Sequence, residues 1–89
     1  MRAVTVYTGS FCGFCQQVTS LLERRGIAYT EVSVEDYPDL REKLLARSGR
    51  RTLPQVYVGE QYVGGAAELA ALDRSGELTR LTQARNEDG

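Results

Sequence analysis

Hydrophobic and polar residues alternate in two stretches near the start of the chain. Between these stretches lies a segment whose apolar residues recur at helical spacing. Residues 2–7 and residues 27–34 both alternate and are rich in β-branched side chains, which predicts two β-strands. Residues 13–25 predict a helix that ends before a glycine, with apolar positions at Cys15, Val18, Leu21 and Leu22. A strand, a helix and a strand in this order predict a parallel strand pair.

The middle of the chain predicts a second helix and a hairpin. Residues 36–49 open with aspartate and proline, carry leucines at helical spacing and close on glycine, as is typical of a helix. Residues 55–58 and 61–63 are short, strand-like runs separated by Gly59 and Glu60. Such a separation predicts an antiparallel hairpin.

The last part of the chain adds helices to this β-rich segment. Residues 66–74 predict a third helix, and a short fourth helix follows before a polar tail at residues 83–89. Residues 1–82 are thus predicted to form one α/β domain, a four-stranded mixed sheet with helices on both faces, in the order β-α-β-α-β-β-α plus a short C-terminal helix. The predicted core consists of Val4, Val6, Leu21, Leu22, Val32, Val34, Leu44, Val56, Val58 and Leu69.

Composition narrows the class of protein. The chain has 89 residues, enough for one modest core, and 11 basic against 12 acidic residues leave a net charge of −1. This balance gives no general attraction to nucleic acid or to an anionic membrane. No apolar run approaches the roughly 20 residues that span a bilayer, and the N-terminus lacks the features of a signal peptide. A cytoplasmic domain is therefore expected.

The two cysteines carry the clearest chemical signal. Cys12 and Cys15 stand at the predicted start of the first helix, in a chain without histidine. A bridge between them would close too short a loop to stabilise the fold. At a helix N-terminus, free N–H groups and the helix dipole stabilise a thiolate, here at Cys12, and a thiolate is the nucleophilic form. Cys15, on the core-facing side, is expected to stay protonated and act as the resolving thiol. The pair predicts a thioredoxin-like redox motif.

Two other interpretations of the cysteine pair are less favoured. Without histidine or further cysteine, a single chain cannot complete the usual tetrahedral zinc shell, so no metal site is predicted for it. Two inert core cysteines do not fit the glycine-rich, turn-like sequence TGSFCGFC. Redox chemistry is therefore the favoured interpretation.

Two further motifs are weak when taken alone. Pro54, in the sequence TLP, precedes a predicted strand, where a proline marks either an ordinary strand start or a cis peptide bond. Gly64 and Gly65 precede a predicted helix, where they form either a plain turn or a place for backbone N–H groups to meet an anion.

Together, CGFC at 12–15, TLP at 52–54 and GG at 64–65 resemble the glutaredoxin family, over about residues 4–81. The resemblance implies a thioredoxin/glutaredoxin fold with Pro54 in cis facing the cysteines. It implies a glutathione-dependent thiol–disulfide oxidoreductase, with glutathione as reducing co-substrate. It also implies protein partners that carry disulfides or glutathione adducts.

The resemblance assigns roles to individual residues. Cys12 matches the nucleophile that forms a mixed disulfide, and Cys15 matches the resolving thiol. In the family, a backbone segment pairs with the cysteine of glutathione. A polar or cationic side chain binds the glycine carboxylate, and the start of a helix holds the γ-glutamyl end. The residues that match this glutathione-binding set are Arg41, Thr52, Leu53, Pro54, Gly65, Ala66, Ala67 and Glu68.

Three positions depart from the family pattern. Gly9 stands where many glutaredoxins have lysine, Ala67 replaces a polar side chain, and Gly13 replaces the usual proline between the cysteines. Fewer charged contacts are expected to weaken glutathione binding and to favour other small thiols more.

Gly13 also opens a second hypothesis. Monothiol glutaredoxins have CGFS, one residue away from CGFC, and resemble carriers of [2Fe–2S] clusters. In such a carrier Cys12 of each of two protomers would be a ligand and two glutathiones would complete the shell. The long insertion of those carriers is absent here, so the expected state is a monomer, and a dimer only with a cluster. A third hypothesis is a thioredoxin-type donor that a flavoprotein reduces.

Overall fold

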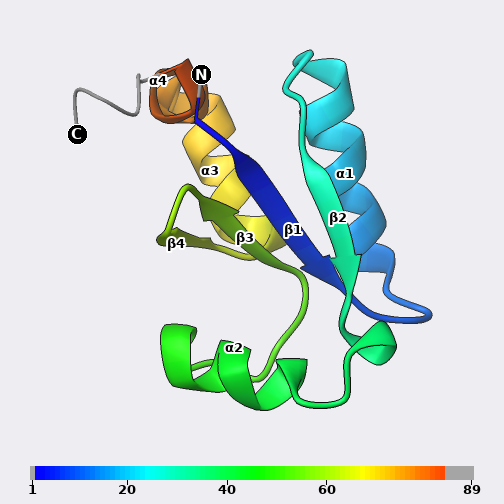
Figure 1. Ribbon diagram of the computed structural model, residues 1–89. Helices are drawn as coiled ribbons and strands as arrows, with labels where there is room; N and C mark the ends of the chain where they lie inside the picture. The colour runs from blue at the N-terminus through cyan, green and yellow to red at the C-terminus, as the bar shows by residue number, and fades with distance from the viewer. Residues whose placement is uncertain (1, 84–89) are drawn as a thin grey trace.

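The computed structural model describes residues 2–83 and shows a single mixed sheet with helices on both faces (Figure 1). This arrangement confirms the predicted α/β class and the predicted order of elements. The elements are β1 (Val4–Thr8), α1 (Gly13–Arg24), β2 (Thr30–Ser33), the short 3₁₀ helix η1 (Val34–Asp36), α2 (Leu40–Ser48), β3 (Gln55–Val58), β4 (Gln61–Gly64), α3 (Ala66–Ser75) and α4 (Glu77–Gln83).

The strands lie in the order β2-β1-β3-β4. β1 runs parallel to β2, as the crossover through α1 requires, and antiparallel to β3; the hairpin places β4 antiparallel to β3. In this register Val6 lies between Glu31 of β2 and Val56 of β3. The loop that leads to the cysteines follows directly after the C-terminal end of β1.

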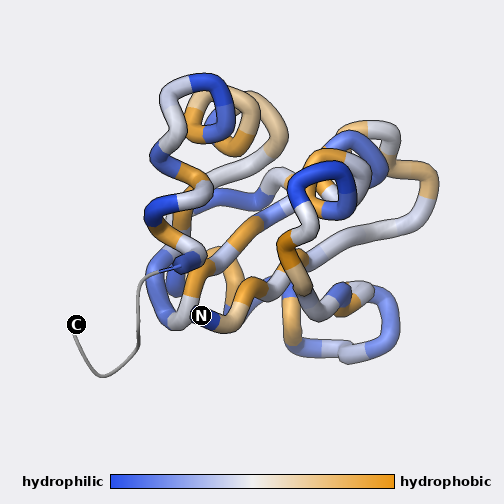
Figure 2. Tube along the Cα trace, turned by 90° about the horizontal axis from the view of Figure 1, so that it is seen from above, coloured by the Kyte–Doolittle hydropathy of each residue, from blue (hydrophilic) through white to orange (hydrophobic). Residues whose placement is uncertain are grey.

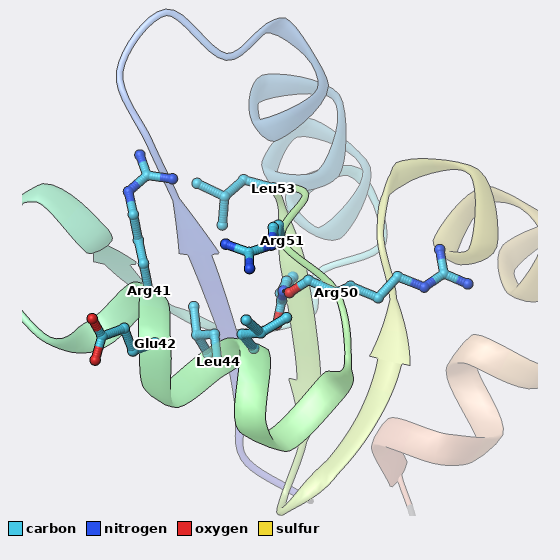
Figure 3. A pocket seen from close by; sticks show the side chains of 8 residues that line it. Arg41, Glu42, Leu44, Arg50, Arg51 and Leu53 are labelled. Carbon is cyan, nitrogen blue, oxygen red and sulfur yellow. The ribbon is translucent and has the colours of Figure 1, made fainter.

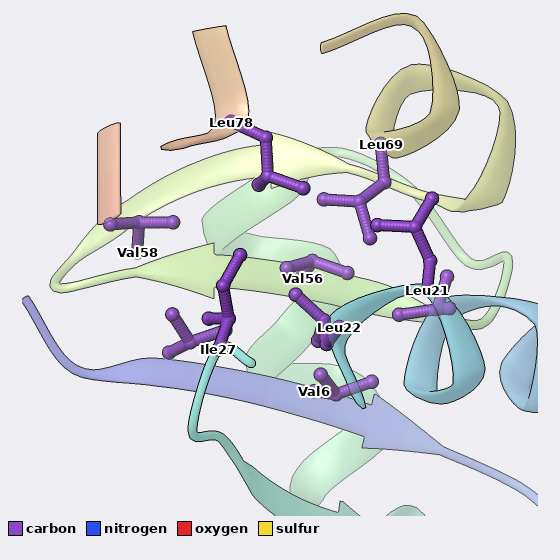
Figure 4. Packing of buried hydrophobic residues seen from close by; sticks show 10 residues of the cluster. Val6, Leu21, Leu22, Ile27, Val56, Val58, Leu69 and Leu78 are labelled. Carbon is purple, nitrogen blue, oxygen red and sulfur yellow. The ribbon is translucent and has the colours of Figure 1, made fainter. Parts of the chain in front are cut away.

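One face of the sheet packs against α1, α3 and α4 (Figure 4). Alternation along β1 turns Val4 and Val6 toward this face, while Leu22 of α1 and Leu69 of α3 meet them from the helices. The buried residues of this cluster are Val4, Val6, Val18, Leu21, Leu22, Ile27, Val56, Val58, Leu69 and Leu78. Burial of these apolar side chains is the main source of stability on this side.

The opposite face packs against α2. Its buried centre is formed by Val34, Leu44 and Tyr57, and Leu53 packs against it. Tyr57 is 2% exposed, and the guanidinium of Arg47 lies 4.4 Å from the centre of its ring. β3 is therefore buried along its whole length, because helices cover it on both sides. Figure 2 shows the hydrophobic stretches along the central strands and recurring turn by turn on the helices.

β2 is shorter than predicted. The prediction covered residues 27–34, whereas the strand covers Thr30–Ser33. Ile27 is buried, but its N–H donates to Leu22 O at 2.9 Å, so it closes the end of α1 and does not join the sheet. β2 also lies at the edge of the sheet, and Val32, a predicted core residue, is only half-buried.

α2 begins later than predicted. Val34–Asp36 forms the separate turn η1, and the chain then bends so that Leu40 N–H donates to Tyr37 O at 3.2 Å. The aspartate and proline that predicted a helix start therefore belong to this connection. The end of α2 is as predicted, with Gly49 in the left-handed region at φ 74°.

The C-terminal part follows the prediction closely. α3 ends where Gly76 adopts φ 83°, and α4 covers Glu77–Gln83. The rest of the predicted polar tail, residues 84–89, lies outside the described residues. Among residues 2–83, no helix is long and apolar enough to cross a bilayer.

Candidate active site

Cys12 caps the N-terminus of α1. Its backbone is extended, with φ −110° and ψ 100°, and its sulfur accepts a hydrogen bond from the N–H of Cys15 at 3.2 Å. This confirms the predicted position of the two cysteines on the helix. Because free N–H groups and the positive end of the dipole gather here, the sulfur lies where negative charge is best accommodated.

Cys15 lies one turn into α1 on its buried side. The residue is 5% exposed, and both cysteines are free thiols. The pKa of the Cys15 thiol is raised to about 12, mainly by burial and in part by the hydrogen bond and the charge of the neighbouring Cys12. A raised pKa favours the protonated form of Cys15, in line with the prediction for this thiol.

A carboxylate fixes the loop that leads into Cys12. Glu35 of η1 accepts hydrogen bonds from the Ser10 N–H, at 3.0 Å, and from the Ser10 hydroxyl. The hydroxyl and N–H of Ser10 lower the pKa of Glu35, with a smaller contribution from the charge of Arg41. The loop then passes through Phe11, which has φ 56° and is fully exposed. Glu35 thus holds the chain immediately before the cysteine.

The segment before β3 faces Cys12 from the other side. The Leu53–Pro54 peptide bond is cis, and the Leu53 carbonyl oxygen lies 3.9 Å from Cys12 Sγ. Behind it, Gln55 is almost fully buried, and its amide donates to Arg50 O at 2.9 Å and to Thr52 O at 3.3 Å. A buried glutamine therefore fixes the path of the whole segment.

A groove of about 290 Å³ lies between Phe14, the segment before β3 and the start of α3, and Cys12 lines a neighbouring cavity of about 440 Å³. The groove brings together most of the predicted glutathione-binding residues, and its lining is Phe14, Arg50, Thr52, Leu53, Pro54, Tyr62, Gly65, Ala66, Ala67 and Glu68. At the α3 end the carboxylate of Glu68 accepts the Gly65 N–H at 2.7 Å. The Glu68 carboxylate is therefore the hydrogen-bond acceptor for one of the N–H groups that a helix start leaves without a backbone partner.

Arg41 lies on the other side of Leu53, in a second cavity of about 230 Å³ (Figure 3). Its guanidinium reaches over the loop before Cys12, since a methyl group added at Gly9 would lie 3.8 Å from it. The same added methyl group would lie 3.0 Å from Leu53. Arg41 is thus near the site but separated from the first groove by the Leu53 side chain.

The described residues hold no group of three or more metal-ligating side chains.

Comparison with known proteins identifies the family. The family model described as Glutaredoxin matches residues 4–63. The chain belongs to the glutaredoxin family. It is 38% identical over 84 residues to a glutaredoxin of Pseudomonas aeruginosa, which covers 94% of this chain and 100% of that protein. It is 36% identical over 81 residues to glutaredoxin 3 of Escherichia coli K12, which covers 91% of this chain and 98% of that protein.

Solved glutaredoxin structures share the fold. The solution structure of glutaredoxin from Brucella melitensis matches with a TM-score of 0.82 at 37% identity, covering 96% of this chain and 95% of that chain. The crystal structure of a buckwheat glutaredoxin–glutathione complex matches with a TM-score of 0.83 at 27% identity, covering 89% and 74%. The protein is therefore a thiol–disulfide oxidoreductase of the thioredoxin/glutaredoxin fold.

Three features of this glutaredoxin site were not predicted from the sequence. The exposed aromatic side chains of Phe11 and Phe14 flank Cys12, Glu35 anchors the loop, and Arg50 lines both the groove and the second cavity. The spacing of phenylalanines around the cysteines could have indicated the first feature. No local pattern indicates the other two, because both depend on contacts between distant parts of the chain.

Proposed function

We propose that this glutaredoxin reduces protein disulfides and glutathione mixed disulfides with electrons from glutathione, in a reducing compartment such as the cytoplasm. The observation that carries the proposal is the placement of Cys12. Its sulfur caps α1 and lies 3.9 Å from the carbonyl oxygen of Leu53, a residue that also lines the groove leading to the start of α3.

The reaction proceeds by two thiol–disulfide exchanges. The Cys12 thiolate attacks one sulfur of the substrate disulfide, an S–S bond forms to Cys12, and the other substrate sulfur leaves as a thiolate that takes up a proton. For a glutathione adduct, a second glutathione attacks the Cys12–glutathione bond, releases reduced Cys12 and forms glutathione disulfide. One free glutathione is thus consumed for each adduct, and the other half of the glutathione disulfide comes from the substrate.

Protein disulfides need Cys15 as well. Its pKa is raised in part by the hydrogen bond and the charge of Cys12. Both contributions disappear once Cys12 is engaged in a mixed disulfide, so the pKa of Cys15 falls at the moment when its thiolate is needed. Cys15 then attacks Cys12, the substrate leaves as a thiolate, and the internal disulfide is reduced by two glutathiones.

The groove supplies contacts for the tripeptide. The backbone of Thr52 and Leu53 would pair with the cysteine of glutathione as an added strand. The start of α3, from Gly65 to Glu68, would receive the γ-glutamyl end, and Arg41 would attract the glycine carboxylate. Glu68 would exchange its bond to the Gly65 N–H for the ammonium group of the ligand.

Cysteine variants and two electron donors test the proposal. Cys12→Ser is expected to abolish glutathione-dependent reductase activity, while Cys15→Ser retains turnover of glutathione adducts because the route through Cys12 alone stays open. Wild-type protein is expected to accept electrons from glutathione and to be a poor substrate for a thioredoxin reductase. Efficient reduction by the flavoprotein alone would replace this proposal with a thioredoxin-type donor.

We also propose, as a second function, the binding of a [2Fe–2S] cluster by two protomers and two glutathiones. Cys12 is only half-buried, and a side chain at Gly13 would meet no atom within 4 Å, so the space beside the sulfur is open. Anaerobic reconstitution with iron, sulfide and glutathione would give a coloured dimer that Cys12→Ser cannot form. A colourless monomer after reconstitution would rule this function out.

A further inference from the structure

Three arginines lie beside Leu53, with Glu42 in the lining of the same cavity and Glu35 near Arg41. Within residues 2–83 the ion pairs join Arg25 to Asp73 and Arg80 to Glu77, and none involves Arg41, Arg50 or Arg51. All three arginines line the cavity of about 230 Å³ beside Leu53. Because three guanidinium groups outnumber the one carboxylate among its lining residues, this cavity favours an anionic ligand.

Hydrogen bonds hold the backbone at Arg50, the first of the two adjacent arginines. The Arg50 N–H donates to the Ser48 hydroxyl at 3.1 Å, and the Arg50 carbonyl accepts from the buried Gln55 amide at 2.9 Å. The other end of that amide accepts from the buried Tyr57 hydroxyl at 3.0 Å. The side chains of Arg50 and Arg51 are exposed, while these hydrogen bonds hold the backbone of Arg50 in place.

The side chains of Arg50 and Arg51 extend in different directions. Figure 3 shows the guanidinium groups of Arg41 and Arg51 beside Leu53, while Arg50 extends away from them. Arg50 also lines the groove that contains the start of α3, where it is the only cation among the lining residues, and Arg51 does not line that groove. Leu53 lines both cavities, as Arg50 does.

We propose that Arg50 and Arg51 are specificity-determining residues that bind the two terminal carboxylates of glutathione, one at each end. This inference rests on the proposed use of glutathione. Arg50 binds the γ-glutamyl carboxylate beside the start of α3, and Arg51 joins Arg41 at the glycine carboxylate. Arg50 thereby supplies, from across the groove, a polar contact that Ala67 cannot make.

Three peptide adducts separate the two contacts. A model peptide is linked by a disulfide to glutathione, to the glycine ethyl ester of glutathione, or to cysteinylglycine. The ester lacks the glycine carboxylate charge, and the dipeptide lacks the γ-glutamyl group. The readout is kcat/KM for release of the free peptide by wild-type protein and by Arg50→Gln and Arg51→Gln.

Each variant is expected to lose only its own contact. Arg51→Gln lowers kcat/KM for the glutathione adduct about three- to tenfold and leaves the ester unchanged, because the partner of Arg51 is already missing there. Arg50→Gln lowers kcat/KM by a similar factor for the glutathione and ester adducts and leaves the cysteinylglycine adduct unchanged. Arg74→Gln, in the last turn of α3, removes the same charge away from the groove and is expected to change none of the three.

The outcomes distinguish the inference from the proposed function. Equal losses on all three adducts would show a general effect of positive charge and would overturn the inference, as would unchanged rates in both variants. If wild-type protein itself shows no preference for the glutathione adduct over the cysteinylglycine adduct, the proposed use of glutathione fails, and this inference fails with it.

Discussion

At the scale of single residues, the active-site loop depends on one carboxylate. Glu35 belongs to η1, far from Ser10 in the sequence, yet it accepts both the N–H and the hydroxyl of Ser10. Bonds to the charged form hold the pKa of Glu35 below its usual range. A surface glutamate thus positions the residues that precede the nucleophilic cysteine.

This contact makes a pH-dependent contribution that can be measured. Because the pKa of Glu35 is lower in the folded state than in the unfolded state, its contribution to stability is present above the unfolded pKa and is lost as the pH falls through the folded pKa. Ser10→Ala removes the hydroxyl bond, so the pKa of Glu35 should rise toward its ordinary value. NMR titration of the Glu35 side chain checks this, with Glu60, an exposed glutamate of the β3–β4 turn, as the internal control. An unmoved titration curve would contradict the assigned contact.

At the scale of elements, the start of α1 does not require glycine at position 13. Gly13 is the first residue of the helix, and an added side-chain carbon there meets no atom within 4 Å. Cys12 before it is already extended, the conformation that a following proline demands. Proline is favoured at a first helical position because its missing N–H has no partner there in any case.

We therefore expect Gly13→Pro to fold and to be more stable than wild type by about 0.4–1 kcal/mol, because the unfolded chain loses conformational freedom. The free energy of unfolding in urea measures this. Reductase activity with glutathione should persist in the variant. A loss of stability would mean that the loop before α1 needs the freedom of glycine, which the structure does not indicate.

The junction of β4 and α3 has the opposite requirement. Gly64 has φ 126°, and an added Cβ would lie 2.5 Å from the Cβ of Glu68. This close approach lets the Glu68 carboxylate reach back to the Gly65 N–H. Glycine is thus needed at position 64 for both backbone conformation and space.

Gly64→Ala is expected to destabilise the protein by about 2–4 kcal/mol, from the unfavourable backbone conformation and the overlap with Glu68. Urea unfolding measures the loss, and Gly13→Ala is the matched control that should change stability far less. Similar losses in the two variants would contradict the distinction drawn between these glycines.

At the scale of the whole molecule, the sequence predicted what depends on neighbours along the chain. The β-strands, the start of α1 and the end of α3 follow from local periodicity and glycine positions, and the CGFC motif located the chemistry. Val32 was misplaced because burial depends on a strand's place in the sheet, and β2 lies at its edge. Glu35 and Arg50 were missed because their roles depend on distant contacts, with Ser10 and Gln55 respectively.

The two faces of the sheet differ in how they support the segment before β3. The face toward α2 includes Leu53, which faces Cys12, whereas the face toward α1, α3 and α4 includes no residue of the segment 50–54. A cavity on the α2 side is therefore expected to disturb the position of Leu53 and of Arg41. A cavity under α4 is expected to leave both in place.

Leu44→Ala and Leu78→Ala test this division. The two leucines are 2% and 1% exposed, so each truncation should destabilise the protein by about 2–5 kcal/mol. Measured well below the unfolding temperature, Leu44→Ala should also raise KM for glutathione severalfold, because Leu44 lines the cavity that Arg41 and Leu53 share. Leu78→Ala should leave KM unchanged at a comparable loss of stability. If both variants raised KM alike, the substrate groove would depend on the whole core and not on the α2 face, since a general loosening of the fold acts on both sides of the sheet.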